Sequence, residues 1–562
     1  MPTPRRSLWP LALVTAGAAL GLGASCDRRP PQRPSASADA RANTPAEQRP
    51  SLTLYFLTEL DGYLEPCGCQ TRPLGGIDRV AHAIASERDR TPGSILVAAG
   101  DLFFEHPEVE ERMVFQERAR AESMARILDG LHLAAYAPGP ADFALGADAW
   151  RALSSAVHAP ALAANAGMTR STIREVAGAR VGIVGVSDFA PSDGARAAGA
   201  PESTDGLAAT RDAVAEVRRQ GASVVVVLAS VAPRVARSIA SEVEGVDFVI
   251  AARHEGATAP PPERVGRAFV LTAPNQAKGL GAVDLWLRGD GPMRDASDAS
   301  AVAERARLDA RITELNDRIA AWSEDPSVDR AAVEAQRRRL ASLSAQRAQL
   351  DQRAVPTDGR FFRARTLEIS PDVAKQPSVQ SQIASYFRAV NEHNRVAYAD
   401  LRAPPAPPGT ARYLGVEACR DCHEEAYAVW ARTPHHSAYR TLEDISKNFN
   451  LACVGCHVTG YRQPGGSEVV QNEGLRDVQC ETCHGPGSLH VAARGAAARR
   501  ATIRRDAPAT FCATQCHTPE HSDHFDYATY LPRILGPGHG RPVDEDAGVA
   551  ADAAPAQAAA HP

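Results

Sequence analysis

The sequence predicts a multidomain protein in which a layered α/β domain is followed by an α-helical hairpin and by a mainly α C-terminal domain with little regular sheet. Across residues 51–298, short apolar runs such as SILVAAGD and SVVVVLAS alternate with amphipathic helical stretches, the pattern of buried strands joined by helices. Residues 299–355 carry apolar side chains in steps of three and four around a proline-containing turn, which predicts the hairpin. Residues 410–541 combine few strand signals with many cysteines and histidines.

The first 26 residues predict an export signal of the lipoprotein type. Arg5 and Arg6 precede an apolar run over residues 8–22, which ends in small residues directly before Cys26. Lipidation of Cys26 would anchor the chain to a membrane, and plain signal cleavage nearby is the alternative. We therefore expect a periplasmic protein that is lipid-anchored to a membrane, with display at the cell surface as a variant of the same arrangement.

Three segments without core-forming patterns separate or end these domains. Residues 27–50 have many Pro, Arg and Ser and no apolar periodicity, which predicts a disordered tether. Residues 356–409 are expected to connect the hairpin to the C-terminal domain, and they end in the stiff sequence APPAPPG. Residues 542–562 are rich in Ala and Asp and predict a disordered tail.

Three sequences in the C-terminal domain fit the pattern Cys-x-x-Cys-His without deviation: CRDCH, CVGCH and CETCH. In this pattern two thiols attach one edge of a haem, and the adjacent His binds the iron as proximal ligand. A fourth sequence, CATQCH, has one more residue between its cysteines, but its His still follows the second Cys directly. The candidate attachment residues are Cys419, Cys422, Cys453, Cys456, Cys480, Cys483, Cys512 and Cys516, and the candidate proximal ligands are His423, His457, His484 and His517.

We expect these motifs to hold four covalently bound haems c, of which the fourth departs most from the pattern. A zinc cluster is the alternative for the regular motifs, since paired Cys with His also bind zinc. A disulfide or two free thiols are the alternatives for Cys512 and Cys516. Iron also takes a second axial ligand or keeps a vacancy, and the histidines available for that position are His435, His436, His490, His521, His524 and His539.

The C-terminal region resembles the tetrahaem cytochrome c-554 family. The resemblance covers about residues 410–541 and includes TPHHSAY after the first motif, VTGY after the second, GPGSLH within the third and TPEHSDHF after the fourth. In that family four haems lie in close stacked pairs, and one iron keeps an open site. The resemblance implies that His435 or His436, together with His490 and His539, supplies the distal ligands. One iron would then be five-coordinate, and the second haem is the candidate.

The α/β domain resembles the metallophosphatase fold of 5′-nucleotidase-type enzymes, whose metal ligands occur in the order D-x-H-G, G-D, G-N-H-E and G-H-x-H. The order survives here as ELDG, AAGD, PGPADF and AARHEG. A two-metal mechanism needs a bridging carboxylate and further ligands that complete both metal shells. Asp101 remains, but Glu59 and Asp61 replace an Asp and a His, and Pro140 and Ala141 replace an Asn and a His. We expect a vestigial metal site at most, no bound divalent metal and no phosphatase activity.

Two further features of this domain remain open in the sequence. Arg253 and Glu255 stand in place of the two histidines of the G-H-x-H motif, and His254 lies between those two positions. Cys67 and Cys69 follow the first degenerate motif and are candidates for binding a soft metal, for redox chemistry or for packing. A direct disulfide between cysteines in a C-x-C sequence is strained.

The combined pattern predicts an exported multihaem c-type cytochrome that transfers electrons between periplasmic or membrane-associated partner proteins. The net charge of −5 gives no indication of nucleic-acid binding. One alternative is a multihaem redox enzyme that acts on a small nitrogen or oxygen compound at an open haem. Another is a metal-dependent phosphohydrolase with an electron-transfer appendage. The sequence shows no acid/base set beside an open haem, so an electron carrier is our principal interpretation.

Overall fold

The structure is a computed structural model that describes residues 49–66, 72–89, 91, 93–189, 199–252, 258–297, 299–324, 328–351, 359–518, 521–522, 525–536 and 538–539. The predicted signal peptide with Cys26, most of the predicted tether and the predicted tail lie outside these residues, as do Cys67, Cys69, Arg253, His254, Glu255 and His524. All described residues belong to one compact unit. Within them, no helix combines the length and the apolar character that crossing a membrane requires.

The first of two six-stranded sheets has the strand order β11-β12-β10-β1-β2-β3. β1, β2 and β3 are parallel, whereas β10 runs antiparallel to β1, and β12 runs antiparallel to β10. The strands are β1 (Leu52–Thr58), β2 (Ser94–Gly100), β3 (Leu133–Pro138), β10 (Gly279–Arg288), β11 (Arg294–Asp295) and β12 (Gly359–Glu368).

The second sheet has the order β4-β5-β6-β7-β9-β8, and its four central strands are parallel. Every residue of β6 is buried, as expected for a central parallel strand that is covered on both faces. The strands are β4 (Ser171–Val176), β5 (Ala179–Ser187), β6 (Val224–Ser230), β7 (Phe248–Ala251), β8 (Glu263–Val265) and β9 (Ala268–Leu271).

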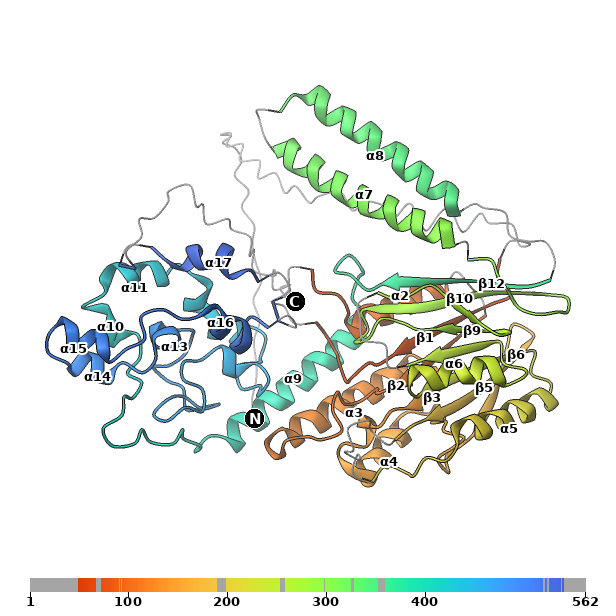
Figure 1. Ribbon diagram of the computed structural model, residues 1–562, viewed down its shortest axis with the longest axis horizontal. Coiled ribbons are helices and arrows are strands. Elements are labelled where there is room, and N and C mark those ends of the chain that lie inside the picture. The colour runs from red at the N-terminus through yellow and green to blue at the C-terminus, as the bar shows by residue number, and fades with distance from the viewer. Residues whose placement is uncertain are drawn as a thin grey trace, which may run out of the picture. The chain divides into compact units, whose positions relative to one another are not determined.

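The two sheets pack face to face, and helices cover their outer faces (Figure 1). Alternation along β1 shows how the sequence produces these layers: Leu54 and Phe56 join the core between the sheets, whereas Tyr55 and Leu57 face the helices. The first sheet is covered by α2 (Ile77–Arg88), α3 (Val114–Gly130), α4 (Gly146–Ala156) and α9 (Pro377–Ala397), and the second by α5 (Gly206–Arg219) and α6 (Pro233–Glu242). The predicted layered α/β domain is confirmed.

The predicted connection over residues 356–409 is not merely a linker. β12 pairs with β10 along its whole length, and Val379, Ile383 and Val390 of α9 are buried in the core against α2 and α3. This part of the segment therefore belongs to the α/β domain. Antiparallel pairing with β10 and burial of an apolar helix face determine its position, and both contacts are remote in sequence.

The predicted helical hairpin is confirmed by α7 (Ala299–Glu324) and α8 (Arg330–Asp351), which pack side by side (Figure 1). Leu308 and Leu315 of α7 and Val333 of α8 are buried between the helices. Arg347 reaches back from α8 to the Asp309 carboxylate at 3.0 Å. The hairpin thus forms through the apolar spacing seen in its sequence, with polar residues on its outer faces.

The C-terminal region consists mainly of short helices, as predicted. In its described residues the extended pairing is limited to an isolated bridge between Val458 and Arg476. The elements are α10 (Glu417–Arg420), α11 (Glu424–Trp430), η4 (Pro434–Ser437), α12 (Ala438–Glu443), η5 (Val454–Cys456), α13 (Cys480–His484), α14 (Ser488–Ala492), α15 (Ala496–Ala501), α16 (Ala509–Gln515) and α17 (Tyr527–Ile534).

Candidate functional site

The first and fourth Cys-His motifs form tight turns that bring the histidine back toward the first cysteine. In the first motif, the His423 amide donates to the Cys419 carbonyl at 3.0 Å. In the fourth, the His517 amide donates to the Cys512 carbonyl at 2.9 Å, one residue further along the chain. A turn widened by one residue is a known helix irregularity. The extra residue of CATQCH is therefore absorbed by the backbone, and His517 still closes the turn.

Three of the four motif histidines face a second histidine ring. The ring centroids of His423 and His490 are 6.1 Å apart with planes at 26°. Those of His484 and His539 are 6.4 Å apart at 19°. Each pair contains one motif histidine and one histidine from outside the motifs.

The third pair joins His517 of the irregular motif to His435, with centroids 6.3 Å apart at 50°. The neighbouring His436 is exposed and packs edge-on against Trp430 instead. Of the two adjacent histidines, His435 is therefore the one whose ring lies opposite a motif histidine.

The separation in these pairs fits a metal ion held between two imidazoles. Metal–nitrogen bonds of about 2.0 Å on each side place the two ring centroids about 6.3 Å apart. Direct ring stacking would bring them closer, as for Phe115 and His393 at 3.4 Å. The three histidine pairs thus have the spacing of axial ligands, with room for an iron between the rings.

His457 of the second motif differs from the other three. Among the described residues no histidine ring faces it, and its Nδ1 lies 2.5 Å from the carbonyl oxygen of Ala438. Because a carbonyl only accepts, Nδ1 carries the proton and Nε2 keeps a free lone pair. Such a bond orients an imidazole for metal binding.

Two further histidines are oriented by main-chain carbonyl groups in the same manner. Nδ1 of His490 lies 2.9 Å from the Arg499 carbonyl oxygen, and Nδ1 of His484 lies 2.9 Å from the Arg504 carbonyl oxygen.

Burial lowers the pKa of His435 to about 4, with a smaller contribution from His517. A neutral imidazole is the form that binds a metal.

None of the eight motif cysteines forms a disulfide in the described part of the chain, and this includes Cys512 and Cys516. Motifs distant in sequence lie next to each other. A hydrogen bond with the Cys480 thiol, together with burial, raises the pKa of Cys419. A hydrogen bond with Cys456 and burial do the same for Cys516. The first motif therefore neighbours the third, and the second neighbours the fourth.

The apolar core of the C-terminal region is small. Its buried apolar cluster contains only Tyr439, Val454 and Val458, with Tyr461 packed against it, among the described residues. A region of this length normally needs a larger core or bound groups that supply one. The eight thiols, the paired rings and the small protein core together fit covalently bound haem.

Two buried polar residues support the third motif and were not identified from the sequence. The carboxylate of Glu481, inside CETCH, accepts bonds from the amides of Leu414, Gly415 and Gly487 at 2.7–3.1 Å. The Gln479 side chain accepts from the Val416 amide at 2.7 Å. These residues fix the segment before the first motif onto the third, a contact that the spacing of Cys and His does not reveal.

The predicted vestigial metal site brings its acidic residues together, but backbone amides occupy their oxygens. Glu59 accepts from the Asp101 amide at 3.0 Å, and Asp101 accepts from the Ala141 amide at 2.7 Å. Asp142 accepts from the amides of residues 102, 103 and 139 at 2.8–3.1 Å. Within the described residues no group of three or more His, Cys, Asp or Glu side chains is arranged to hold a metal ion.

Close packing explains why glycine remains in these degenerate motifs. Gly62 has a φ of 67°, and a Cβ there would lie 2.4 Å from the Phe103 carbonyl oxygen. At Gly139 a Cβ would lie 2.1 Å from an Asp101 carboxylate oxygen. The scaffold of the site thus persists for steric reasons, independently of metal binding.

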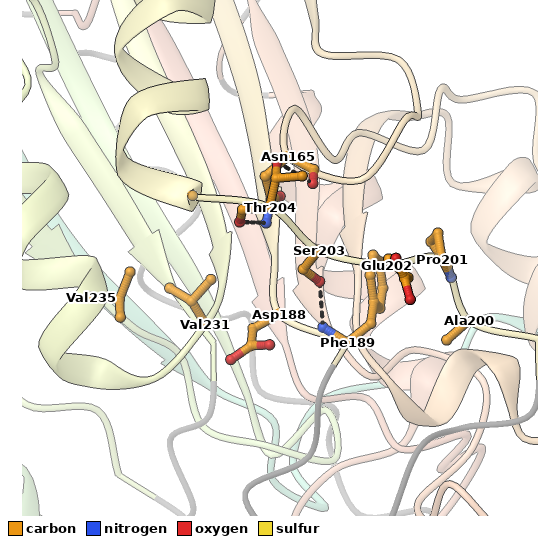
Figure 2. Close-up of a pocket in the computed structure, with 11 residues that line it drawn as sticks. Asn165, Asp188, Phe189, Ala200, Pro201, Glu202, Ser203, Thr204, Val231 and Val235 are labelled. Atoms are coloured by element: carbon orange, nitrogen blue, oxygen red, sulfur yellow. Dashed lines mark hydrogen bonds between the residues drawn. The ribbon is translucent and has the colours of Figure 1, made fainter.

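A separate pocket of about 250 Å³ lies where β5 ends and α5 begins (Figure 2). The Phe189 amide donates to the Ser203 hydroxyl at 3.0 Å, and the Thr204 amide donates to the Asn165 carbonyl at 2.8 Å. Asp188 also lines this pocket. Its described lining residues include none of the predicted site residues.

The Cys-His motifs and the facing histidine rings give the C-terminal region the features of a c-type cytochrome domain. Residues 418–485 match the family model described as cytochrome c554 and c-prime. Cytochrome c-554 of Nitrosomonas europaea is 33% identical over 93 residues, which are 14% of this chain and 40% of that cytochrome. The chain thus spans about two fifths of that relative's length. The match confirms the predicted resemblance and implies covalently bound haem c and electron transfer in this region.

Solved structures similar to the chain include a thiohydrolase and two nucleotidases. Sulfate thiohydrolase SoxB of Thermus thermophilus is 13% identical, with 61% of each chain covered and a TM-score of 0.41. The 5′-nucleotidase precursor of the same species is 15% identical, with 67% of this chain and 68% of that chain covered and a TM-score of 0.42. NAD nucleotidase of Haemophilus influenzae is 12% identical, with 76% and 84% covered and a TM-score of 0.41.

Proposed function

We propose that this chain is an exported electron carrier that holds four haems c and exchanges electrons with partner redox proteins in the periplasm. The observation that carries the proposal is the set of three histidine pairs with ring centroids 6.1–6.4 Å apart. Each pair combines a histidine that follows an attachment cysteine with one from elsewhere in the domain. Bound haem supplies one-electron redox chemistry at each such position.

The ligand assignment follows from these pairs. His423 and His490 serve the first haem, His484 and His539 the third, and His517 and His435 the fourth. The eight thiols from Cys419 to Cys516 form the covalent attachments. Two imidazole ligands keep the coordination of iron unchanged on reduction, which suits electron transfer.

The contacts between motifs support rapid exchange among the haems. Thiols of the first and third motifs touch, as do thiols of the second and fourth. The pKa of His539 is lowered by burial and by the neighbouring His484 and His423, which agrees with a shared environment for two motifs. Cys483 of the third motif also lies near Cys512 of the fourth. Electrons would therefore pass among all four haems, and a partner protein would need to approach only one of them.

A reductive titration tests this function directly. Anaerobic addition of dithionite to the haem-loaded chain should deliver about four electrons and develop the absorption bands of reduced c-type haem. The protein should then pass these electrons to an external acceptor such as a small soluble cytochrome. A protein that takes up no electrons, or that retains them in the presence of the acceptor, contradicts the proposal.

A second candidate function rests on His457, which no described histidine faces. The iron bound by His457 would keep an open position for a small nitrogen or oxygen compound. The test is reoxidation of the reduced chain by nitric oxide, nitrite or dioxygen in the absence of a protein acceptor. Catalytic turnover would make the chain a redox enzyme, whereas single reoxidation at stoichiometric amounts leaves it an electron carrier.

For the α/β domain we propose a scaffold role without phosphohydrolase activity or resident divalent metal. Support comes from the backbone amides that satisfy Asp101 and Asp142 and from Pro140, which offers no ligand atom in its side chain. The test is hydrolysis of a nucleoside monophosphate with added manganese, which should not occur.

We also propose that Cys26 carries the lipid that attaches the exported protein to a membrane. The test is the variant Cys26→Ala, which should lose its attachment to the membrane.

A further inference from the structure

The segment that carries the second Cys-His motif is bound to helices of the α/β domain. We call residues 447–461 the second attachment loop; it contains Cys453, Cys456 and His457. The loop contacts α3 and α9, the two helices that pack together over the first sheet. His457 is also the motif histidine without a facing ring among the described residues.

The loop begins at an ion pair. Lys447 pairs with Glu65, and its Nζ also lies 3.8 Å from the centroid of the Phe387 ring on α9. Both charged side chains are largely buried, with exposed fractions of 16% and 24%. Asn391 of α9 then accepts a hydrogen bond from the Phe449 amide at 2.8 Å.

Two buried amide side chains bind the next residues of the loop. The Asn394 amide on α9 donates to the Phe449 carbonyl at 2.9 Å. Oε1 of Gln116 on α3 accepts from the Leu451 amide at 3.1 Å and faces Nδ2 of Asn394 at 3.5 Å. Gln116 is 3% exposed and Asn394 is 1% exposed, so water cannot replace these partners.

This contact is transmitted to the attachment residues through a short turn. The Asn450 carbonyl accepts from the amides of Cys453 and Val454 at 3.0 and 2.9 Å, and its side chain accepts from Ala452. Asn450 is itself 3% exposed. The main chain that Gln116 holds at Leu451 is thus separated from Cys453 by a single residue.

The end of the loop is held by the same helical layer. Arg112, directly before α3, donates to the Tyr461 hydroxyl at 3.0 Å, and its guanidinium lies 3.8 Å from the Glu468 carboxylate. The pKa of Tyr386 on α9 is raised, chiefly by burial and in smaller part by nearby groups that include Cys453. Both ends of the loop and its first cysteine therefore lie against the α/β domain.

We infer that Gln116 and Asn394 are positioning residues for the second haem, so that the α/β domain sets the environment of the iron bound by His457, which no second histidine of the described residues faces. This inference rests on the proposed function, because it concerns the iron that His457 would bind. It gives the α/β domain a role in electron transfer that needs neither a metal nor hydrolysis. A loop held by buried hydrogen bonds samples fewer conformations, and a larger fraction of molecules then presents the open position correctly.

The test replaces the acceptor on α3 in the haem-loaded full-length protein. Gln116→Met keeps the length of the side chain and removes Oε1, which leaves the Leu451 amide buried without a partner. We expect amide hydrogen exchange over residues 449–457 to become about fivefold faster, and the carbon monoxide affinity of the reduced protein to fall by a similar factor, the size typical for one buried hydrogen bond. Absorption bands of the three two-histidine haems should not change.

Two matched variants separate positioning from general damage. Gln116→Glu keeps an oxygen acceptor at the same place and should restore slow exchange. Gln380→Met makes the same change from Gln to Met at an exposed position of α9. It should leave hydrogen exchange and carbon monoxide affinity unchanged. Asn394→Ala removes the donor to the Phe449 carbonyl without adding bulk. It should also give faster hydrogen exchange and weaker carbon monoxide binding, and it serves as the test if Gln116→Met yields no folded protein.

The inference would be overturned if amide hydrogen exchange over residues 449–457 were as slow in both Gln116→Met and Asn394→Ala as in the wild type. It would also be overturned if Gln380→Met accelerated this exchange as much as Gln116→Met. A wild-type protein that binds no carbon monoxide would instead contradict the open iron of the proposed function. Hydrogen exchange would still decide whether Gln116 and Asn394 hold the loop, so the two failures can be told apart.

Discussion

In the proposed four-haem protein, single histidines would decide what each iron can do. His423, His484 and His517 each face a second ring, whereas His457 is oriented by the Ala438 carbonyl and faces none among the described residues. An iron between two imidazoles has no free position for a diatomic ligand, and an iron with one imidazole has. The distribution of rings therefore predicts one reactive iron among four.

Removal of one facing histidine should create a second reactive iron. We expect the reduced wild-type protein to bind about one carbon monoxide per chain and His490→Ala to bind about two. His436→Ala is the matched control, since His436 is exposed and contacts Trp430. The measurement is a carbon monoxide titration followed by absorbance, and an unchanged stoichiometry in His490→Ala would show that His490 is not a ligand.

Asp61 illustrates a different residue-level property, the burial of a carboxyl group near others. Burial, together with Glu59, Glu105 and Asp142, raises the pKa of Asp61 to about 8. The folded protein therefore binds a proton there that the unfolded chain, with an ordinary carboxyl pKa of about 4, releases. Stability should fall as the pH rises between these two values.

The variant Asp61→Asn should remove this dependence on pH. Asparagine is uncharged and tolerates the left-handed backbone at this position, where φ is 55°. We expect the midpoint of thermal unfolding to rise relative to wild type at pH 8 and to change little at pH 4. The exposed Asp148→Asn serves as control, and a uniform shift of the Asp61→Asn midpoint at all pH values would rule out the titration as its cause.

At the scale of elements, short turns place the attachment residues, and long-range contacts hold those turns together. The fourth motif accommodates its extra residue because the His517 amide reaches the Cys512 carbonyl. Glu481 performs the corresponding task between motifs, since its carboxylate accepts three amides from two segments. Glu481 is 2% exposed, and its hydrogen bonds with the amides of Gly415 and Gly487 are buried.

Loss of the Glu481 carboxylate should destabilise the C-terminal region markedly. Glu481→Ala leaves three amides without their acceptor, and we expect a loss of at least about 2 kcal/mol from buried, unsatisfied donors. Glu417→Ala, on the exposed face of α10, should have little effect. Denaturant unfolding of the haem-loaded protein provides the comparison, and equal midpoints for the two variants would argue against a structural role for Glu481.

Local sequence patterns predicted those parts of the fold and site that depend on local chemistry. Short continuous apolar runs indicated β1 and β6, and the spacing of Leu308 and Leu315 indicated the hairpin. Adjacent Cys and His fixed the candidate proximal ligands. The pairing of His435 with His517 was not predictable, because it depends on packing between remote segments.

The same limitation explains the segments whose roles differ from expectation. β12 follows the hairpin in sequence but pairs with β10, which precedes it, so its strand character depends on a partner across the hairpin. α9 likewise contributes Val379 and Val390 to a core formed mostly by earlier residues. Gln116 appears in the sequence as an ordinary helix residue, and only the approach of Leu451 gives it a function.

At the scale of the whole molecule, the α/β domain and the cytochrome domain are joined through the second attachment loop. Lys447, Gln116 and Asn394 lie at this junction, and their contacts are largely buried. In the function proposed above, the α/β domain would thus act as a support for redox groups. The carboxylate of Asp142, which three backbone amides satisfy, agrees with that support role.

The central claim is that four haems are attached covalently to this one chain, and intact mass spectrometry measures this directly. The protein should be produced in cells that attach haem c and weighed under denaturing conditions, which remove groups that are not covalently bound. We predict the mass of the processed chain with four haems, and three haems for the double variant Cys512→Ala, Cys516→Ala. A wild-type protein with three haems would contradict the assignment of the CATQCH motif, and a wild-type protein with none would contradict the account as a whole.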